Sequence, residues 1–251
     1  MAPSVVLVTG ANRGIGYEIV KALVESQIPY HVFLAARDIE KGKAAAATIK
    51  PREGSSISVL ELEVSSTESI ARAAETVKAE AGRVDFLVNN AGIVDESADA
   101  MTRLRNTLEI NTIAPFAVTQ AFKPLLIVQP KNETKEKRVI YVSSGLGSIA
   151  EKLDPKSKYY AVQATEYRMS KSALNMLAAC DAFDLKDHGV KVFAYDPEFV
   201  ATSLSLSPEE RRKMGALEPS VSGESCRDII EGKRDADTAK LVSINGADWP
   251  W

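Results

Sequence analysis

Tyr167 and Lys171 are the residues whose types and spacing could do chemistry in this chain. They stand four positions apart in a stretch whose apolar pattern predicts a helix to about residue 186. Both side chains should therefore lie on one helical face, about one turn apart. An ammonium close to a phenol favours the phenolate and should lower the pKa of Tyr167. The pair predicts a general acid that works near neutral pH.

The spacing alone is a weak signal, because Tyr17 and Lys21 repeat it. Those two residues follow a glycine-rich turn near the start of the chain, where solvent and packing explain them. Tyr167 differs because a predicted strand that ends in serine, at 139–143, precedes it. Tyr159 has no lysine four residues later, and we do not expect it to act as the acid.

Two further polar residues could complete this site. The strand at 139–143 delivers Ser143 and Ser144 to the carboxyl edge of a sheet, and side-chain alternation sends their hydroxyls to opposite faces. Asn111 stands inside a helical stretch from about 98 to 128. Because asparagine competes with the helix backbone for hydrogen bonds, three interpretations are open: its side chain has a task, the helix is irregular there, or it is a plain surface residue.

The chain begins with a predicted apolar strand that runs into a turn holding Gly10, Gly14 and Gly16. Glycines adopt backbone angles closed to other residues and let main-chain amides approach a ligand. The helix predicted from Gly14 to about residue 26 would direct its positive N-terminal end at an anion. The turn therefore predicts a phosphate site, and a tight turn without a ligand is the alternative.

The end of the second predicted strand, at 30–36, distinguishes between two dinucleotides. In dinucleotide-binding folds an acid at this place binds the ribose 2′-hydroxyl, whereas an arginine can bind a 2′-phosphate. Arg37 occupies this place, and Asp38 is either that acid or the N-cap of the next helix. Arg13, inside the glycine turn, could supply a second cation. We therefore predict NADPH/NADP as the cofactor.

The order of elements and the composition limit the class of protein. Strand-like and helix-like segments alternate along most of the 251 residues without a linker or a repeat, which predicts a single α/β domain over 1–251 with a parallel sheet covered on both faces. With 31 basic and 34 acidic residues, the chain has no electrostatic footprint for nucleic acid or for an anionic membrane. No apolar run is long enough to span a bilayer. The polar run at 131–138 is predicted to be a solvated loop.

Cysteine and histidine are too few and too scattered to define a site. Cys180 and Cys226 stand alone, so we expect buried free thiols, a reducing compartment and a cytoplasmic protein whose first strand follows the N-terminus directly. His31 and His188 lie far apart in the sequence, and no metal site is predicted.

Five elements, in this order, resemble the short-chain dehydrogenase/reductase family over about residues 4–245. They are Thr-Gly-Ala-Asn-Arg-Gly-Ile-Gly at 9–16, Asn-Asn-Ala-Gly at 89–92, Asn111, Ser144, and Tyr167 with Lys171. The resemblance implies one doubly wound Rossmann-type domain, with a seven-stranded parallel sheet that binds NAD(P) across the carboxyl ends of its strands. Arg37 and Arg13 make the chain most similar to the NADPH-dependent carbonyl reductases.

The resemblance also implies a role for each matching residue. Tyr167 would be the acid/base, and Ser144 would hold the substrate carbonyl. Asn111 would anchor a water that relays protons, and Lys171 would hold the nicotinamide ribose and tune Tyr167. The predicted cofactor-binding set consists of Tyr167, Lys171 and residues at the turn and the strand ends: Gly10, Asn12, Arg13, Gly14, Ile15, Gly16, Arg37, Glu63, Val64, Asn89, Ala91, Gly92, Pro197, Val200 and Thr202. Glu63 could equally be a solvated loop acid.

Two features depart from the family pattern. The stretch after Ser144 is longer than in most members, so an insertion near 145–166 should cover the substrate together with a segment near 198–232. It resembles the insertion of monomeric carbonyl reductases, which leaves a homodimer and a monomer both open. Members usually carry Pro-Gly where this chain has Pro197 and Glu198. Glu198 either turns outward or faces the site and favours a basic substrate.

The sequence thus predicts an NADPH-dependent reductase that transfers hydride to a ketone or aldehyde of a small organic molecule, with Tyr167 as the acid. A non-redox or bifunctional enzyme of the same family, such as an isomerase, dehydratase or cyclase, is the first alternative. A nucleotide-sensing binding protein is the second, although a sensor has no use for the acid. The expected partner is a small-molecule carbonyl substrate, with no nucleic acid and no membrane.

Overall fold

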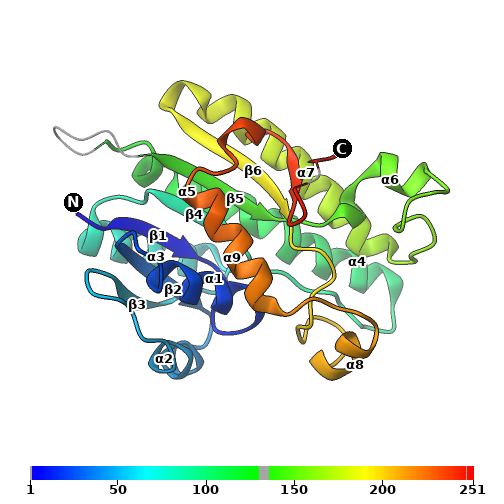
Figure 1. Cartoon of the computed structure of the whole chain (residues 1–251), viewed down its shortest axis with the longest axis horizontal. Helices are drawn as coiled ribbons and strands as arrows, with labels where there is room; N and C mark the ends of the chain where they lie inside the picture. Colours follow the sequence, from blue (N-terminus) through cyan, green and yellow to red (C-terminus); the bar gives the residue numbers. More distant parts are fainter. Residues whose placement is uncertain (1, 130–135, 247) are drawn as a thin grey trace.

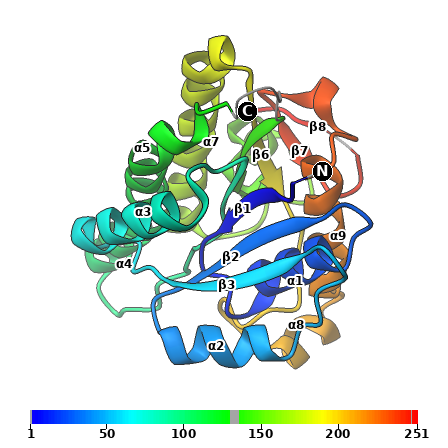
Figure 2. The same ribbon diagram turned by 90° about the vertical axis from the view of Figure 1, so that its left-hand side faces the viewer.

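An eight-stranded sheet forms the centre of the computed structural model, which describes residues 2–129, 136–246 and 248–251. Its strands lie in the order β3-β2-β1-β4-β5-β6-β7-β8, of which Figure 1 labels β1 to β6 and Figure 2 labels β7 and β8. Strands β1 to β7 pair in parallel, which confirms the predicted doubly wound sheet with seven parallel strands. The strands are β1 (Ser4–Val8), β2 (Tyr30–Ala36), β3 (Ser56–Glu61), β4 (Phe86–Asn89), β5 (Lys137–Val142), β6 (Val190–Asp196), β7 (Leu241–Ser243) and β8 (Asp248–Trp249).

The eighth strand was not expected from the sequence. β8 pairs antiparallel with β7, and Leu241 lies opposite Trp249. Gly246, in the short connection between them, has a φ of 81°, in the left-handed region that favours glycine. A short connection reverses the chain but cannot cross the sheet, so the added strand has to be antiparallel.

Helices cover both faces of the sheet (Figure 2). Along β1, Val5 and Leu7 pack into one apolar core and Val6 and Val8 into the other, because successive strand side chains point to opposite faces. Helices α3, α5 and α7 pack on the first core, and α1 and α9 on the second. The α-helices are α1 (Gly14–Val24), α2 (Ile39–Ala47), α3 (Thr67–Ala81), α4 (Ala100–Leu108), α5 (Ala114–Leu126), α6 (Ile149–Leu153), α7 (Thr165–Leu185), α8 (Pro208–Lys213) and α9 (Pro219–Ile230). A π-helical turn, η1 (Glu109–Ile113), and the 3₁₀ turns η2 (Gly145–Gly147), η3 (Lys186–His188) and η4 (Asp235–Asp237) complete the set.

Lys137 and Arg138 show that the prediction of a solvated loop at 131–138 was wrong at its end; residues 131–135 lie outside the described residues. Both residues begin β5 and are buried. The Nζ of Lys137 lies 3.0 Å from Oδ1 of Asp85, and both side chains are fully buried. A carboxylate partner offsets the cost of burying each cation, which the local sequence does not reveal.

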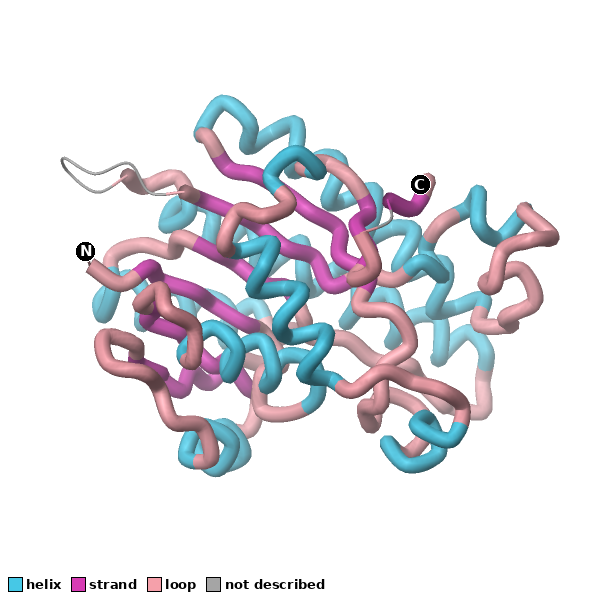
Figure 3. Tube along the Cα trace, in the orientation of Figure 1, coloured by secondary structure: helices cyan, strands magenta, loops and turns pink. Residues whose placement is uncertain are grey.

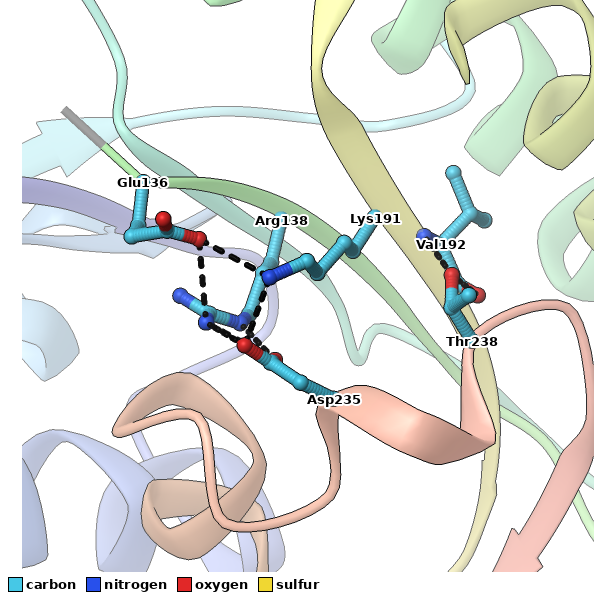
Figure 4. A network of polar contacts seen from close by, with 6 residues as sticks. All are labelled: Glu136, Arg138, Lys191, Val192, Asp235 and Thr238. Carbon is cyan, nitrogen blue, oxygen red and sulfur yellow. Dashed lines mark hydrogen bonds and ion pairs between the residues drawn. The ribbon is translucent and has the colours of Figure 1, made fainter. Parts of the chain in front are cut away.

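Arg138 belongs to an ion-pair network at the amino ends of β5 and β6 (Figure 4). Its guanidinium lies 2.8 Å from Asp235, and the Nζ of Lys191 lies 2.6 Å from the same carboxylate. Glu136 lies 3.4 Å from Arg138 and 3.1 Å from Lys191. The network holds η4 against the sheet at the edge opposite to the strands' carboxyl ends, and so it is far from the region where the sequence places the site.

Two smaller expectations have different outcomes. Cys226 is buried, as predicted, whereas Cys180 is exposed on α7, so the prediction of two buried thiols was wrong for Cys180. Within the part of the chain that the structure describes, every helix is too short or too polar to span a membrane.

Candidate active site

Tyr167 and Lys171 lie in the first two turns of α7, as their spacing predicts. Lys171 is only 4% exposed, and its Nζ donates a 2.8 Å hydrogen bond to the carbonyl oxygen of Val142. The same Nζ lies 5.6 Å from the centre of the Tyr167 ring. Because Val142 is the last residue of β5, the pair lies at the carboxyl edge of the sheet.

The acidity of Tyr167 differs from the sequence-based prediction. Burial raises the pKa of Tyr167, the carboxylate of Asp196 raises it further, and Arg211 opposes both. Burial also lowers the pKa of Lys171 to about 8. The expectation that Lys171 lowers the pKa of Tyr167 was therefore wrong: burial is the largest cause of the shift, and the cation that opposes it is Arg211. At neutral pH the phenol is protonated, which is the form that donates a proton.

Asn111 lies within the π-helical turn η1, so the predicted long helix is irregular at this residue. Its buried side chain is fully engaged. Oδ1 accepts from the N–H of Ile93 at 2.8 Å, while Nδ2 donates to the Ile93 carbonyl at 2.9 Å and to Ser170 Oγ at 3.0 Å. The interpretation of Asn111 as a plain surface residue is therefore excluded. Its side chain links the segment after β4 to α7 at Ser170, the residue before Lys171.

The two serines after β5 turn to opposite sides, as strand alternation predicts. Ser143 is buried and donates its hydroxyl proton to Asn175 Oδ1 at 2.5 Å. The Oγ of Ser144 instead accepts from the N–H of Leu146 at 3.2 Å. Since a hydroxyl has one proton and two lone pairs, Ser144 keeps its proton for another acceptor.

The glycine turn has the geometry that its sequence predicts. Gly10 and Gly14 have φ values of 63° and 58°, which favour glycine. A Cβ on Gly16 would lie 2.8 Å from the carbonyl oxygen of Gly10. In the described chain, the N-cap residue Arg13 makes no side-chain hydrogen bond to the first turn of α1. The N–H groups of this turn fit an anionic ligand such as phosphate.

Asn90 shapes the glycine turn, although it was not in the predicted cofactor-binding set. Its Nδ2 donates to the carbonyl oxygens of Thr9 and Gly10 at 2.8 and 3.2 Å, and so holds the turn in place. Asn89, the residue predicted instead, turns into the core, where its Nδ2 donates to Thr119 Oγ1 at 3.0 Å. The alternation of side chains at the end of β4 is the signal that could have separated the two asparagines.

Gly92 lies where the glycine turn and the predicted catalytic residues meet. A Cβ at this position would lie 3.3 Å from Asn111 Oδ1 and 3.7 Å from Lys171 Nζ. At the other end, a Cβ on Gly14 would lie 3.4 Å from Thr202 Cγ2. The backbone of Gly92, beside the buried amine of Lys171, and the N-terminus of α1, which has no side-chain cap, together border a space that side chains at these glycines would fill. These residues fit an elongated dinucleotide.

Arg37 and Arg13 are both exposed, at the end of β2 and in the glycine turn. Asp38 has the second of its two predicted roles, the N-cap of α2. Its Oδ1 accepts from two backbone N–H groups of the first turn, both at 3.1 Å, and the hydrogen bond from Lys41 lowers its pKa. The carboxylate is thus committed to the helix, while Arg37 is free to face a ligand.

The other predicted residues frame the same edge. Asn12 and Ile15 are half-buried in the glycine turn, and Ala91 donates its N–H to Thr9 Oγ1 at 3.0 Å. Glu63 lies beyond the end of β3, where its Oε1 accepts hydrogen bonds from the N–H and the Oγ of Ser65 at 3.2 and 2.9 Å. Its carboxylate is therefore used within its own loop. Val64 packs against the first core.

The loop after β6 is held from both sides. The carbonyl oxygen of Pro197 accepts from Ser222 Oγ at 3.2 Å, and that of Val200 accepts from Arg211 Nε at 2.7 Å. Between them, Glu198 takes neither orientation that the sequence left open. Its side chain is only 8% exposed, and the residues it contacts lie in the insertion and at the end of β7.

Comparison with known proteins defines the class. A profile of the short chain dehydrogenase family matches residues 4–213. The chain therefore belongs to the short-chain dehydrogenase/reductase family, whose members are oxidoreductases that bind a nicotinamide cofactor.

Two relatives and one structural neighbour match nearly the whole chain. The short-chain dehydrogenase/reductase eupG of a Phoma species is 36% identical, over 98% of this chain and 97% of eupG. The short-chain dehydrogenase/reductase tropE of Talaromyces stipitatus is 31% identical, over 98% and 97%. The NADPH-bound carbonyl reductase from chicken fatty liver has a TM-score of 0.84 and 27% identity, and each chain is covered completely. The chain is thus similar to carbonyl reductases.

Proposed function

We propose that the protein is an NADPH-dependent reductase, which transfers hydride to the carbonyl carbon of a ketone or aldehyde of a small organic molecule. The arrangement around Lys171 carries the proposal. Its Nζ donates a hydrogen bond to the carbonyl oxygen of Val142, two residues before Ser144. The same Nζ lies close to the ring of Tyr167 and to the backbone of Gly92, which has no side chain. The similarity to an NADPH-bound carbonyl reductase supports the same reaction.

The chain's own side chains then manage the proton and the developing charge. Bound NADPH supplies the hydride. Tyr167 donates its phenolic proton to the carbonyl oxygen, and its raised pKa ensures that this proton is present at neutral pH. Ser144 donates a second hydrogen bond to the same oxygen, because the N–H of Leu146 occupies only an acceptor position on its Oγ.

Each part of the cofactor has a matching group on the protein. We assign the pyrophosphate to the glycine turn and the N-terminus of α1, which lacks a cap from Arg13. The nicotinamide ribose is assigned to Lys171. Arg37, with Arg13 as a second cation, is assigned to the 2′-phosphate, since Asp38 is committed to capping α2.

A spectrophotometric assay with NADPH and a panel of ketones and aldehydes tests the proposed reaction. We expect NADPH to be consumed in step with formation of an alcohol. Product that forms without consumption of NADPH would instead indicate an isomerase, dehydratase or cyclase. Binding of NADPH with no product from any compound would favour the nucleotide-sensing alternative.

Lys171 predicts how NADPH affinity depends on pH. Burial lowers its pKa to about 8, below that of a free lysine, so the folded protein loses this proton as the pH rises through 8. The ammonium form attracts the anionic dinucleotide more strongly than the amine does. We therefore expect the Kd for NADPH, measured by nicotinamide fluorescence, to rise about tenfold between pH 7 and 9. Lys171→Met should bind weakly with little pH dependence, and a flat wild-type profile would refute the assignment.

A further inference from the structure

Glu198 has a backbone conformation that side chains rarely adopt. Its φ of 64° lies in the left-handed region, where glycine is favoured. This conformation explains physically why a Pro-Gly pair suits this turn. A glutamate persists in such a conformation only when its surroundings hold it there.

The carboxylate of Glu198 supplies those surroundings by joining three segments of the chain. Oε2 accepts a hydrogen bond from Lys158 Nζ and lies 3.3 Å from the hydroxyl of Tyr159, both in the insertion. Oε1 accepts from Ser243 Oγ at 3.0 Å and from Asn245 Nδ2 at 3.4 Å, at the end of β7. Glu198 itself follows β6, so one side chain connects the insertion to the end of β7.

Further contacts join the same two regions. The rings of Tyr159 and Trp249 pack edge to face with centroids 5.5 Å apart, and Lys158 Nζ lies 5.1 Å from the centre of the Trp249 ring. Ser148 Oγ donates to the carbonyl oxygen of Pro250 at 2.5 Å. The C-terminal end of the chain therefore lies beside the start of the insertion (Figure 1), as the tube in Figure 3 also shows.

Tyr159 of the insertion packs against the backbone next to Ser144. A Cβ on the next residue, Gly145, would lie 2.9 Å from Asp196 Oδ2 and closer still to the ring of Tyr159. The hydroxyl of Tyr159 donates to the same oxygen of Asp196 at 3.1 Å. Any displacement of Tyr159 would thus open space beside the predicted catalytic serine.

We propose that Glu198 is a positioning residue for the carbonyl substrate, because it clasps the insertion at 145–166 to the end of β7 and so fixes the entrance to the substrate site beside Ser144. The proposal rests on the proposed function. Lys158, Ser243 and Asn245 all donate to the carboxylate of Glu198, so we do not expect it to recognise a basic group on the substrate. Its influence on substrate binding passes through the insertion.

Glu198→Gln tests the clasp, since it preserves the shape of the side chain and removes its charge. We expect amide hydrogen exchange to accelerate in peptides from 148–164 but not in peptides from β5. The KM for the carbonyl substrate should rise about tenfold, while kcat and the Kd for NADPH change by less than about threefold. Glu75→Gln, the same change at an exposed acid of α3, is the matched control and should leave all four quantities unchanged.

Lys158→Met provides the second variant, because this lysine is half-exposed and its replacement is compatible with folding. It should reproduce the effects of Glu198→Gln, and the double variant should add little to either single change. Wild-type exchange of the insertion in both variants would overturn the clasp, and faster exchange with an unchanged KM would overturn its role in positioning. A wild-type protein that consumes no NADPH with any carbonyl would refute the proposed function instead, whatever the exchange rates.

Discussion

Tyr167→Phe is expected to lower kcat for carbonyl reduction by about 10²–10⁴-fold while the Kd for NADPH stays within a few-fold of the wild-type value. The substitution removes one oxygen atom and leaves the ring beside Lys171, 5.6 Å from its Nζ. Because the pKa of the phenol is raised by burial and by Asp196, the wild-type side chain carries its proton throughout the neutral range. Steady-state kinetics together with NADPH fluorescence separate the loss of the acid from a loss of binding.

The chain contains a matched control for this experiment. Tyr17→Phe alters the tyrosine of the other Tyr-x-x-x-Lys pattern, on α1, whose hydroxyl lies 2.8 Å from Thr48 Oγ1. This variant should retain nearly wild-type kcat. Equal losses in the two variants would show that a general effect on the fold was being measured, and full activity of Tyr167→Phe would remove the proposed acid.

Arg37→Asp has the second large expected effect, a change of about a hundredfold in the preference for NADPH over NADH. The planar guanidinium suits a 2′-phosphate, whereas a carboxylate repels that phosphate and accepts a hydrogen bond from a free 2′-hydroxyl. The side chain is exposed at the end of β2, so the substitution should not disturb the core. The measurement is the ratio of kcat/KM for the two cofactors with one carbonyl substrate.

Arg52→Asp makes the same change in net charge at an exposed position just before β3. That position lies at the amino edge of the parallel sheet, away from the proposed cofactor, so the preference should stay as in the wild type. A similar shift of the cofactor preference in both variants would mean that the overall charge of the protein determines this preference. An unchanged kcat/KM ratio in Arg37→Asp would argue against a 2′-phosphate at this residue.

The parts of the site that were predicted from the sequence are those fixed by local geometry. The helical spacing of Tyr167 and Lys171 and the alternation of Ser143 and Ser144 depend only on the period of one element. Asn111 was recognisable because asparagine fits poorly inside a regular helix, and the structure contains a π-turn there. Asn89 was placed in the predicted set instead of Asn90, although the same alternation rule applied to the end of β4 would have separated the two.

The sequence by itself determined the alternating α/β order and the glycine turn, because apolar periodicity and glycine placement act over a few neighbouring residues. The family was recognised from five motifs in order, and the seven parallel strands were what that resemblance implied. Only the tertiary structure decided the raised pKa of Tyr167, the burial of Lys137 and the partners of Glu198. Each of these depends on charges or walls from distant segments, such as Asp196 beside Tyr167 or Lys158 beside Glu198. Desolvation and ion pairing are properties of that assembled environment, and local sequence patterns do not contain them.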